Sequence, residues 1–164
     1  MEVLSSFSRF PSQMEVAEIM LRHGIAVRNG KAYCGDIEIS DSALGRAAGV
    51  DRRVAKTTID RITKDTKLSA IFSKLVSISL FSDVASEIGC STLEIIPTDA
   101  TLPGILADVA SVIYQAGVTI RQAVVDDPMF NKEAHLIIVL NGELPADFIP
   151  VLRSTRGVAS IIIR

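Results

Sequence analysis

Four basic residues in the first half of the chain have the spacing of a surface that contacts nucleic acid. At about 100° per residue, one side of a helix carries Arg52, Arg53, Lys56, Thr57 and Arg61. The other side is almost entirely apolar and consists of Val54, Ala55, Thr58, Ile59 and Ile62. Arginine and lysine bind phosphate, and arginine and threonine also reach base edges in the major groove. The pattern predicts a DNA-contacting helix, with the solvated face of an ordinary helix as the alternative.

The second candidate feature is the turn Pro103-Gly104, which begins another helix. Pro103 has no backbone N–H and Gly104 tolerates unusual dihedral angles, so the turn can bring backbone amides close to a ligand. The amides near Gly104 and Ile105 would bind a carboxylate, aided by the helix dipole. Apolar residues then recur at three- and four-residue spacing as far as Ala116, and Gly117 ends the helix.

Catalytic and metal-binding chemistry has little support in the sequence. His23 falls in a predicted helix and His135 begins a predicted strand, and neither has an evident nucleophile or acid partner. Cys34 and Cys90 are the only cysteines, and no other ligands accompany them at metal-binding spacing. We therefore expect no enzyme activity, no catalytic residue, no metal site and no cofactor.

Composition and charge restrict the class of protein further. The 164 residues are 48% apolar, with no Trp and two Tyr, which is typical of a globular protein and disfavours aromatic stacking on bases. Because no apolar run approaches the roughly 20 residues that span a bilayer, we expect a cytoplasmic protein without membrane contact. Residues 40–75 hold eight basic and four acidic side chains, whereas residues 90–164 hold five and eight. This asymmetry indicates that one end meets an anionic partner.

The first part of the chain is predicted to form helices and a small hairpin. Residues 1–10 have no clear period and are interpreted as a loose arm or a docking segment. Pro11 and Ser12 are start signals for a helix over 13–23. Asn29-Gly30 favours a type I′ hairpin turn. A small hairpin beside helices is a common accessory of winged helical DNA-binding folds.

Two short helices then follow in a helix-turn-helix arrangement. Ser40 or Asp41 can cap a helix that runs to about Ala48, and Asp51 can cap the basic helix over 52–65. Gly49-Val50 joins the two helices, which gives the helix-turn-helix shape.

The second half of the chain is predicted to form a module of strands and helices, preceded in the sequence by a packed connecting segment. Residues 75–81 are apolar enough for a buried helix or strand, and this connection could instead make a dimer contact. The strands are predicted over 91–97, 118–125, 135–140 and 158–164, and the helices over 105–116 and 145–155. Residues 126–133 are interpreted as a long hairpin loop. The predicted order is therefore β-α-β-β-α-β.

The segment PGILADVASVIYQAGVTI, within this order of elements, resembles an ACT domain, the amino-acid-sensing module of metabolic enzymes and regulators. With the upstream helix-turn-helix-like segment, the chain resembles the archaeal ACT-domain regulators of amino acid metabolism. The resemblance implies an α+β protein. Its parts would be a helix-turn-helix-like domain with a small hairpin over 1–75, a connection over 76–89, and a ferredoxin-like ACT domain over 90–164.

The resemblance also implies a ligand site where the first strand of the ACT domain turns into its first helix. Carried over by position, the ligand-binding candidates are Thr98, Asp99, Thr101, Leu102, Pro103, Gly104, Ile105 and Leu106. The family pattern has an acidic residue two positions before the proline, where this chain has Thr101. Asp99, four positions before the proline, is the candidate for binding the amino group of an amino acid.

Taken together, these features predict an amino-acid-responsive transcription regulator. The N-terminal domain would bind DNA, and the ACT domain would bind the amino acid and form a homodimer or a higher homo-oligomer. Two alternatives are a regulatory subunit that does not bind DNA but controls a biosynthetic enzyme, and a purely structural ACT dimer. The effector, the DNA target and the direction of regulation stay open.

Overall fold

The chain folds as a mixed α+β protein with two antiparallel sheets, seen in a computed structural model that describes residues 2–127 and 134–164. It divides into two compact units, Met1–Ser79 and Leu80–Arg164. The division falls within residues 76–89, the segment predicted to connect two domains. Residues 128–133, most of the predicted hairpin loop, lie outside the described residues.

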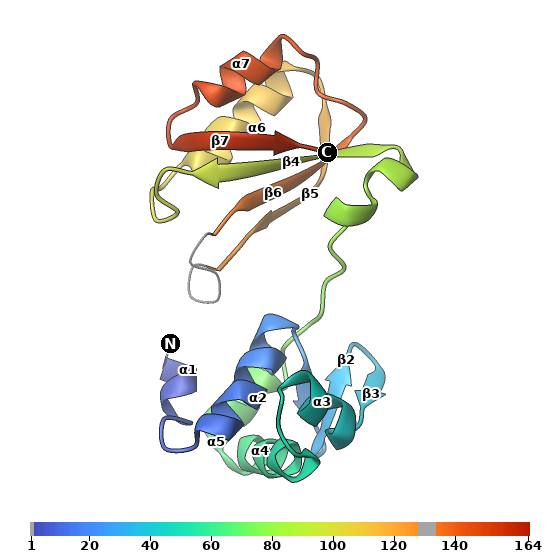
Figure 1. Cartoon of the computed structure of the whole chain (residues 1–164), viewed down its shortest axis with the longest axis vertical. Coiled ribbons are helices and arrows are strands. Elements are labelled where there is room, and N and C mark those ends of the chain that lie inside the picture. The colour runs from blue at the N-terminus through green and yellow to red at the C-terminus, as the bar shows by residue number, and fades with distance from the viewer. Residues whose placement is uncertain (1, 128–133) are drawn as a thin grey trace. The chain divides into compact units, whose positions relative to one another are not determined.

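The first unit packs helices against a three-stranded sheet (Figure 1). Its elements are α1 (Glu2–Ser5), α2 (Pro11–Arg22), β1 (Ala26–Arg28), β2 (Lys31–Cys34), β3 (Ile37–Ile39), α3 (Asp41–Ala47), α4 (Arg52–Lys64) and α5 (Thr66–Phe72). Of the two interpretations of residues 1–10, the loose arm is wrong, because α1 forms there and Phe7 is fully buried in the core. Burial of this one aromatic side chain fixes a segment that has no sequence period.

The predicted hairpin turn is confirmed. Arg28 and Lys31 are paired across it, and Asn29 and Gly30 have φ angles of 51° and 71°. A type I′ turn requires positive φ at both central residues, which asparagine and glycine tolerate best. Strand β3 extends the hairpin to three strands in the order β1-β2-β3.

Local capping defines the ends of α3 and α4 as predicted. The Ser40 side chain accepts a hydrogen bond from the Ala43 amide at 3.2 Å, and Asp51 Oδ1 accepts one from the Arg53 amide at 2.8 Å. Each cap satisfies a backbone donor that the helix itself leaves unpaired. Between the helices, Gly49 has a φ of 67° and ends α3.

Helices α3 and α4 approach each other closely at Gly45. A Cβ atom on Gly45 would lie 2.9 Å from the carbonyl oxygen of Val50, so a glycine is needed for this approach. The buried side of α4 is the predicted one, formed by Ala55, Thr58, Ile59 and Ile62. Val54 is half-buried.

The predicted buried helix or strand over 75–81 is wrong. The segment has no regular structure before the 3₁₀ turn at Ser82, and the side chains of Val76 and Ile78 are 70% and 79% exposed. The reason is that the alternate residue faces the first unit: Ser77 Oγ donates a hydrogen bond to the carbonyl oxygen of His23. A Cβ atom on Gly24 would lie 2.3 Å from the Val76 carbonyl oxygen. The segment thus packs through Ser77 and turns the side chains of Val76 and Ile78 outward.

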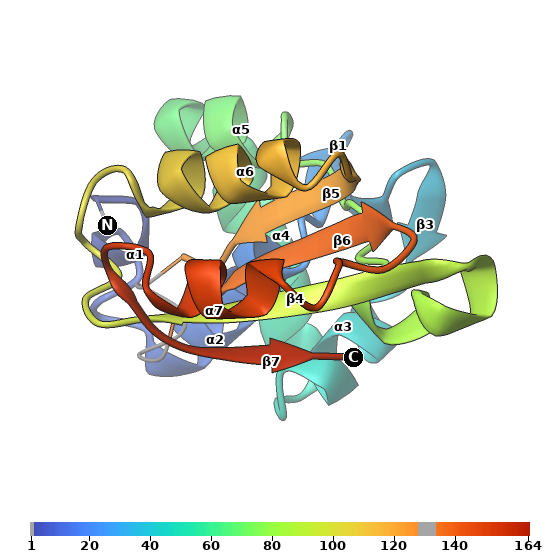
Figure 2. The ribbon, with the colours of Figure 1, turned by 90° about the horizontal axis from the view of Figure 1, so that it is seen from above.

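The second unit is a four-stranded antiparallel sheet with two helices on one face (Figures 1 and 2). Its elements are the 3₁₀ turns η1 (Ser82–Val84) and η2 (Ser86–Ile88), followed by β4 (Cys90–Pro97), α6 (Ile105–Gln115), β5 (Thr119–Val125), β6 (Leu136–Asn141), α7 (Phe148–Arg153) and β7 (Val158–Ile163). The strand order across the sheet is β5-β6-β4-β7. The pairing of β5 with β6 shifts in register between Ile120 and Gln122, which places a bulge at Arg121.

The core of the second unit lies between the sheet and the two helices. It includes Leu93, Ile95, Val109, Ile113, Ile138, Leu140 and Leu152. Helix α7 is shorter than the predicted 145–155, and Leu152 is its only fully buried residue. Phe148 and Ile149 are only partly buried, because a six-residue helix can turn only a narrow face to the sheet.

The other face of the sheet is partly covered by the two 3₁₀ turns. Thr92 Oγ1 donates a hydrogen bond to the Ser82 carbonyl oxygen at 2.9 Å, and the Phe81 amide donates one to Gln122 Oε1 at 2.9 Å. Ala85 is buried there. Among the described residues, none of the helices has the length and apolar character needed to cross a membrane.

Candidate functional site

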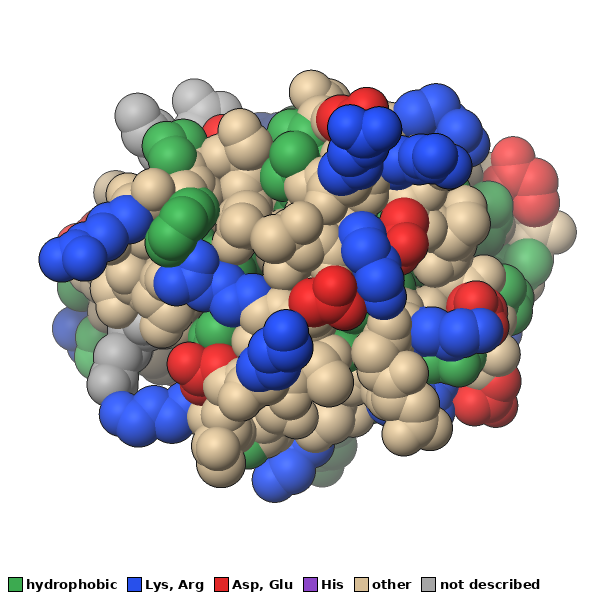
Figure 3. All heavy atoms as spheres, turned by 90° about the horizontal axis from the view of Figure 1, so that it is seen from below, with side chains coloured by type: hydrophobic (Ala, Val, Ile, Leu, Met, Phe, Trp, Pro, Cys, Tyr) green, Lys and Arg blue, Asp and Glu red, His purple; other side chains and the backbone are tan. Residues whose placement is uncertain are grey.

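The first candidate surface is the exposed side of α4. Arg52 and Arg53 lie in its first turn, are exposed, and form no ion pair within residues 2–127 and 134–164. Lys56 is exposed one turn later and pairs with Asp60 at 3.1 Å. An exposed pair of this kind is weak, so its ammonium can exchange partners. Lys and Arg side chains spread across the face of the first unit seen from below, with acidic side chains between them (Figure 3).

Arg61 and Thr57, also predicted to contact DNA, already have partners. The Arg61 guanidinium lies over the rings of Phe10 and Phe7, at 4.2 and 5.6 Å from their centroids, and donates to Gln13 Oε1 at 3.3 Å. It therefore ties α4 to the connection between α1 and α2. Thr57 Oγ1 donates a hydrogen bond to the Arg53 carbonyl oxygen at 2.7 Å, which leaves the hydroxyl able to accept but not to donate.

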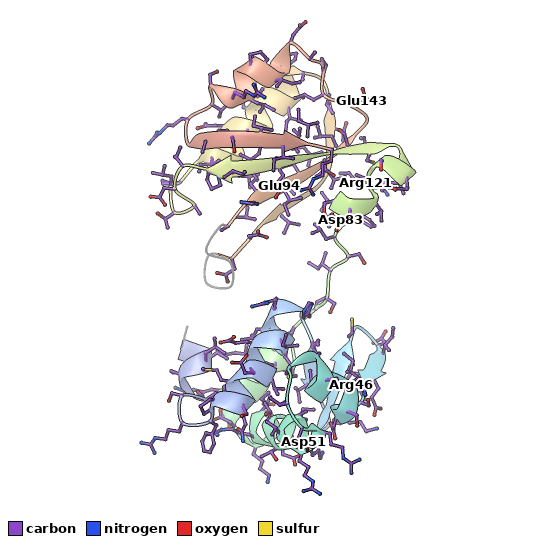
Figure 4. The ribbon with its side chains drawn as sticks, in the orientation of Figure 1. Arg46, Asp51, Asp83, Glu94, Arg121 and Glu143 are labelled. Carbon is purple, nitrogen blue, oxygen red and sulfur yellow. The ribbon has the colours of Figure 1, made fainter. Side chains whose placement is uncertain are left out.

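A groove of about 370 Å³ runs beside α4 and adds a residue that sequence reasoning missed. It is lined by Arg9, Phe10, Pro11, Ser12, Gln13, Arg53, Val54 and Thr57. Arg9 thus shares a groove with Arg53, although 44 positions separate them in the sequence. Residues 1–10 carry no periodic pattern, so no sequence signal places Arg9 beside the basic helix. Figure 4 shows Arg46 on α3 and Asp51 immediately before α4.

The second candidate site is the loop between β4 and α6. Asp99 Oδ1 accepts hydrogen bonds from the Thr101 amide at 2.8 Å and the Thr101 hydroxyl at 2.7 Å. These bonds hold the pKa of the exposed Asp99 carboxyl below its usual value. Asp99 therefore shapes the turn, and Thr101 fixes one of its two carboxylate oxygens.

The loop leads into the uncapped start of α6. Gly104 precedes the helix with a φ of 96°, and no side chain caps the first turn. The carboxylate of Asp108 approaches to 4.0 Å from the position of a Cβ atom on Gly104. The loop is anchored at its other end, where the Thr98 amide donates to the Gly157 carbonyl oxygen at 2.9 Å.

A pocket of about 150 Å³ opens beside this loop. It is lined by Pro97, Ala100, Leu102, Gly104, Ile105, Leu106, Val125, Ala134, His135 and Leu136. Of the predicted ligand-binding residues, four line the pocket and four (Thr98, Asp99, Thr101 and Pro103) do not. The lining from β5 and β6 was missed, because it is brought to the loop by the pairing of Val125 with Leu136, a contact between strands that no local pattern encodes.

His135 links the pocket to an ionic cluster on the other face of the sheet. Its Nδ1 lies 2.8 Å from Glu94 Oε1. Glu94 Oε2 lies 2.8 Å from Arg164 Nη2, an ion pair outside hydrogen-bond geometry. Figure 4 shows Glu94 on the side of the sheet away from α6 and α7. Glu94 and His135 are mostly shielded from solvent, so the imidazole is held in place.

Metal-ligand geometry is absent from the part of the chain that the structure describes, in which no three His, Cys, Asp or Glu side chains gather. Cys34 and Cys90 are free thiols. Neither cysteine, nor His23, lines the basic groove or the pocket.

Comparisons with known proteins leave the chain without a family assignment. No protein-family model matches it, and no curated protein does. Among solved structures, one described as "Crystal structure of PH0061" is similar over 93% of this chain and 88% of its own, at 13% identity and a TM-score of 0.29. A similarity at this TM-score supports no conclusion about this chain.

Proposed function

We propose that the protein is an amino-acid-responsive transcription regulator. In this proposal the first unit binds DNA through α3 and α4, and the second unit is a ferredoxin-like ACT domain that binds an amino acid and forms a homodimer. The observation that carries the proposal is that α4 has two distinct sides. Arg52, Arg53 and Lys56 are exposed on one side, whereas Ala55 and Ile59 are buried on the other.

The DNA-binding part rests on the geometry of two capped helices. In helix-turn-helix proteins, residues in the N-terminal part of the second helix contact base edges. Arg52, Arg53 and Lys56 lie in the first two turns of α4, while the close approach at Gly45 fixes this helix on α3. Arg9 extends the basic surface on one side. Such an arrangement supplies phosphate contacts together with a helix end that fits the major groove.

The sensing part rests on the second unit. Its β-α-β-β-α-β path is that of the ferredoxin-like motif, and its pocket lies beside the β4–α6 loop, where the ACT resemblance places a ligand. A single small DNA-reading module buries little surface, so two copies would strengthen DNA binding. Both β5 and β7 are edge strands in the chain's own sheet, which leaves edges at which a second copy could pair.

The proposal is tested by DNA binding as a function of salt. We expect the full chain to bind labelled promoter fragments with an affinity that falls steeply as salt rises, because bound counterions are released. The double variant Arg52→Ala/Arg53→Ala should lower the slope of log K against log salt by about 2. The matched control Arg22→Ala/Lys74→Ala removes the same charge from exposed positions that line neither the groove nor the buried side of α4. Equal slopes for the two variants would refute the DNA-binding role.

The second candidate function is that of a regulatory subunit that binds an enzyme instead of DNA. It is favoured by the exposed apolar side chains of Val76 and Ile78, which are typical of a protein-binding surface. This function predicts copurification with one enzyme that survives high salt, together with no measurable affinity for DNA.

A further inference from the structure

The pocket beside the β4–α6 loop has a lining that selects the chemistry of its ligand. Nine of the ten described lining residues have apolar side chains or are glycine, and His135 is the one ionisable group among them. The His135 imidazole is engaged through Nδ1 by Glu94, whose other oxygen is paired with Arg164. The described lining therefore offers no free charge to neutralise a charged ligand side chain, and burying such a side chain without a partner is unfavourable.

The size of the pocket suits a small apolar group. Its volume is about 150 Å³, close to that of an engineered apolar cavity in another protein that holds one benzene molecule. A branched side chain of three or four carbons fits this space. Leu102, Leu106 and Val125 line the pocket and remain partly exposed, so a side chain can enter from solvent.

Polar groups for the rest of an amino acid lie outside the pocket, along the loop. The first turn of α6 has no side-chain cap, and its free amides suit a carboxylate. The carboxylates of Asp99 and Asp108 are exposed nearby, and either can pair with an ammonium group. The loop thus offers partners for both the carboxylate and the ammonium group of an amino acid, outside the apolar pocket.

We propose that the effector is an aliphatic amino acid of the valine, leucine and isoleucine class, whose side chain fills this pocket. The inference rests on the proposed function in so far as that function places an effector at the β4–α6 loop. Each buried methylene group is worth roughly fourfold in affinity, so dissociation constants should fall from alanine to valine to leucine.

Calorimetric titration of the full chain with single amino acids tests this ligand class. We expect L-valine, L-leucine and L-isoleucine to bind and L-alanine to bind at least tenfold more weakly than L-leucine. L-lysine and L-glutamate should give no saturation at concentrations that saturate with L-leucine. Binding of either charged amino acid as tight as that of L-leucine, or no binding of the aliphatic series, would overturn the proposal.

A pocket-filling variant identifies the site. Ala100 is exposed and lines the pocket, so Ala100→Phe should occupy the space and weaken L-leucine binding at least tenfold. The control Ala107→Phe adds the same ring at an exposed position of α6 that does not line the pocket. The affinity of this variant for L-leucine should equal that of the wild type. If Ala100→Phe unfolds the chain, Leu106→Asn provides a second variant. It replaces an apolar lining side chain at a partly exposed position by a polar one with the same number of heavy atoms, and it should also weaken L-leucine binding. Equal affinities for wild type and the lining variants would place the ligand elsewhere.

The failure of this inference can be told apart from failure of the proposed function. If L-leucine binds but DNA does not, the ligand class stands and the transcription role fails. If DNA affinity changes with L-lysine or L-glutamate and not with L-leucine, the transcription role stands and the aliphatic effector is refuted.

Discussion

The guanidinium of Arg61 lies 4.2 Å from the ring centroid of Phe10 and so joins the last turns of α4 to the connection that precedes α2. This contact separates Arg61 from the exposed arginines at the other end of the helix. Basic residues on one helical face can therefore differ in role, and the difference is measurable.

The first prediction concerns stability. Arg61→Ala removes two cation–π contacts and a hydrogen bond to Gln13, and should lower the free energy of unfolding of the first unit by about 1–2 kcal/mol. Arg52→Ala removes an exposed side chain and should change it by less than about 0.5 kcal/mol. Urea unfolding followed by circular dichroism compares the two variants. Similar losses in both would show that the stacked geometry contributes little.

The second prediction concerns Arg9. If the groove beside α4 holds a phosphate of bound DNA, Arg9→Ala should weaken binding and lower the salt slope by about 1. Arg22→Ala is the matched control, since Arg22 is exposed on α2 but does not line the groove. Fluorescence anisotropy at several salt concentrations gives both slopes. A slope unchanged by Arg9→Ala would confine the DNA surface to α4.

The third prediction concerns the crossing of α3 and α4. Alanine has the higher helix propensity, by about 1 kcal/mol, but a Cβ atom on Gly45 would lie 2.9 Å from the Val50 carbonyl oxygen. The clash involves backbone, which cannot rotate away, so Gly45→Ala should destabilise the first unit by about 1–3 kcal/mol. Arg46→Ala, at an exposed neighbouring position, is the control. Thermal melting that shows Gly45→Ala to be stabilising would mean that the helices can separate at no cost.

The fourth prediction concerns the pH dependence of the β4–α6 loop. Hydrogen bonds from the Thr101 hydroxyl and amide lower the pKa of Asp99 in the folded chain. A carboxyl whose folded pKa is depressed stabilises the fold above its unfolded pKa, and the contribution is lost as pH falls through the folded pKa. The loop should therefore loosen only in acid, below the ordinary range of an aspartate. Thr101→Val should raise the pKa of Asp99 measured by NMR titration, whereas Thr98→Val should leave it unchanged.

Elements with local signals were predictable from the sequence. Ser40 and Asp51 cap their helices through bonds that span two or three residues, and Asn29-Gly30 sets the hairpin by its own dihedral angles. The buried side of α4 follows from helical periodicity alone. In each case the physical cause lies within a few positions of the residue concerned.

Features that depend on distant contacts were not predictable. Phe7 is buried by helices that come later in the chain. Ser77 donates a hydrogen bond to the His23 carbonyl oxygen, so the neighbouring Val76 and Ile78 are exposed and not buried as predicted. The candidate pocket combines the predicted loop with Val125 and His135 from strands further along the sequence. Half of the predicted ligand-binding residues lie outside it, because position in a family motif does not determine which way each side chain turns.

The bulge at Arg121 makes the two edges of the larger sheet unequal. A bulge hinders the addition of another strand, and the β5 edge has one. The β7 edge pairs regularly along Ile161–Ile163 and shows Ile162 and Ile163 partly exposed. We therefore expect misassembly during refolding at high protein concentration to begin at β7, and a lysine in place of Ile162 to improve the yield of refolded protein.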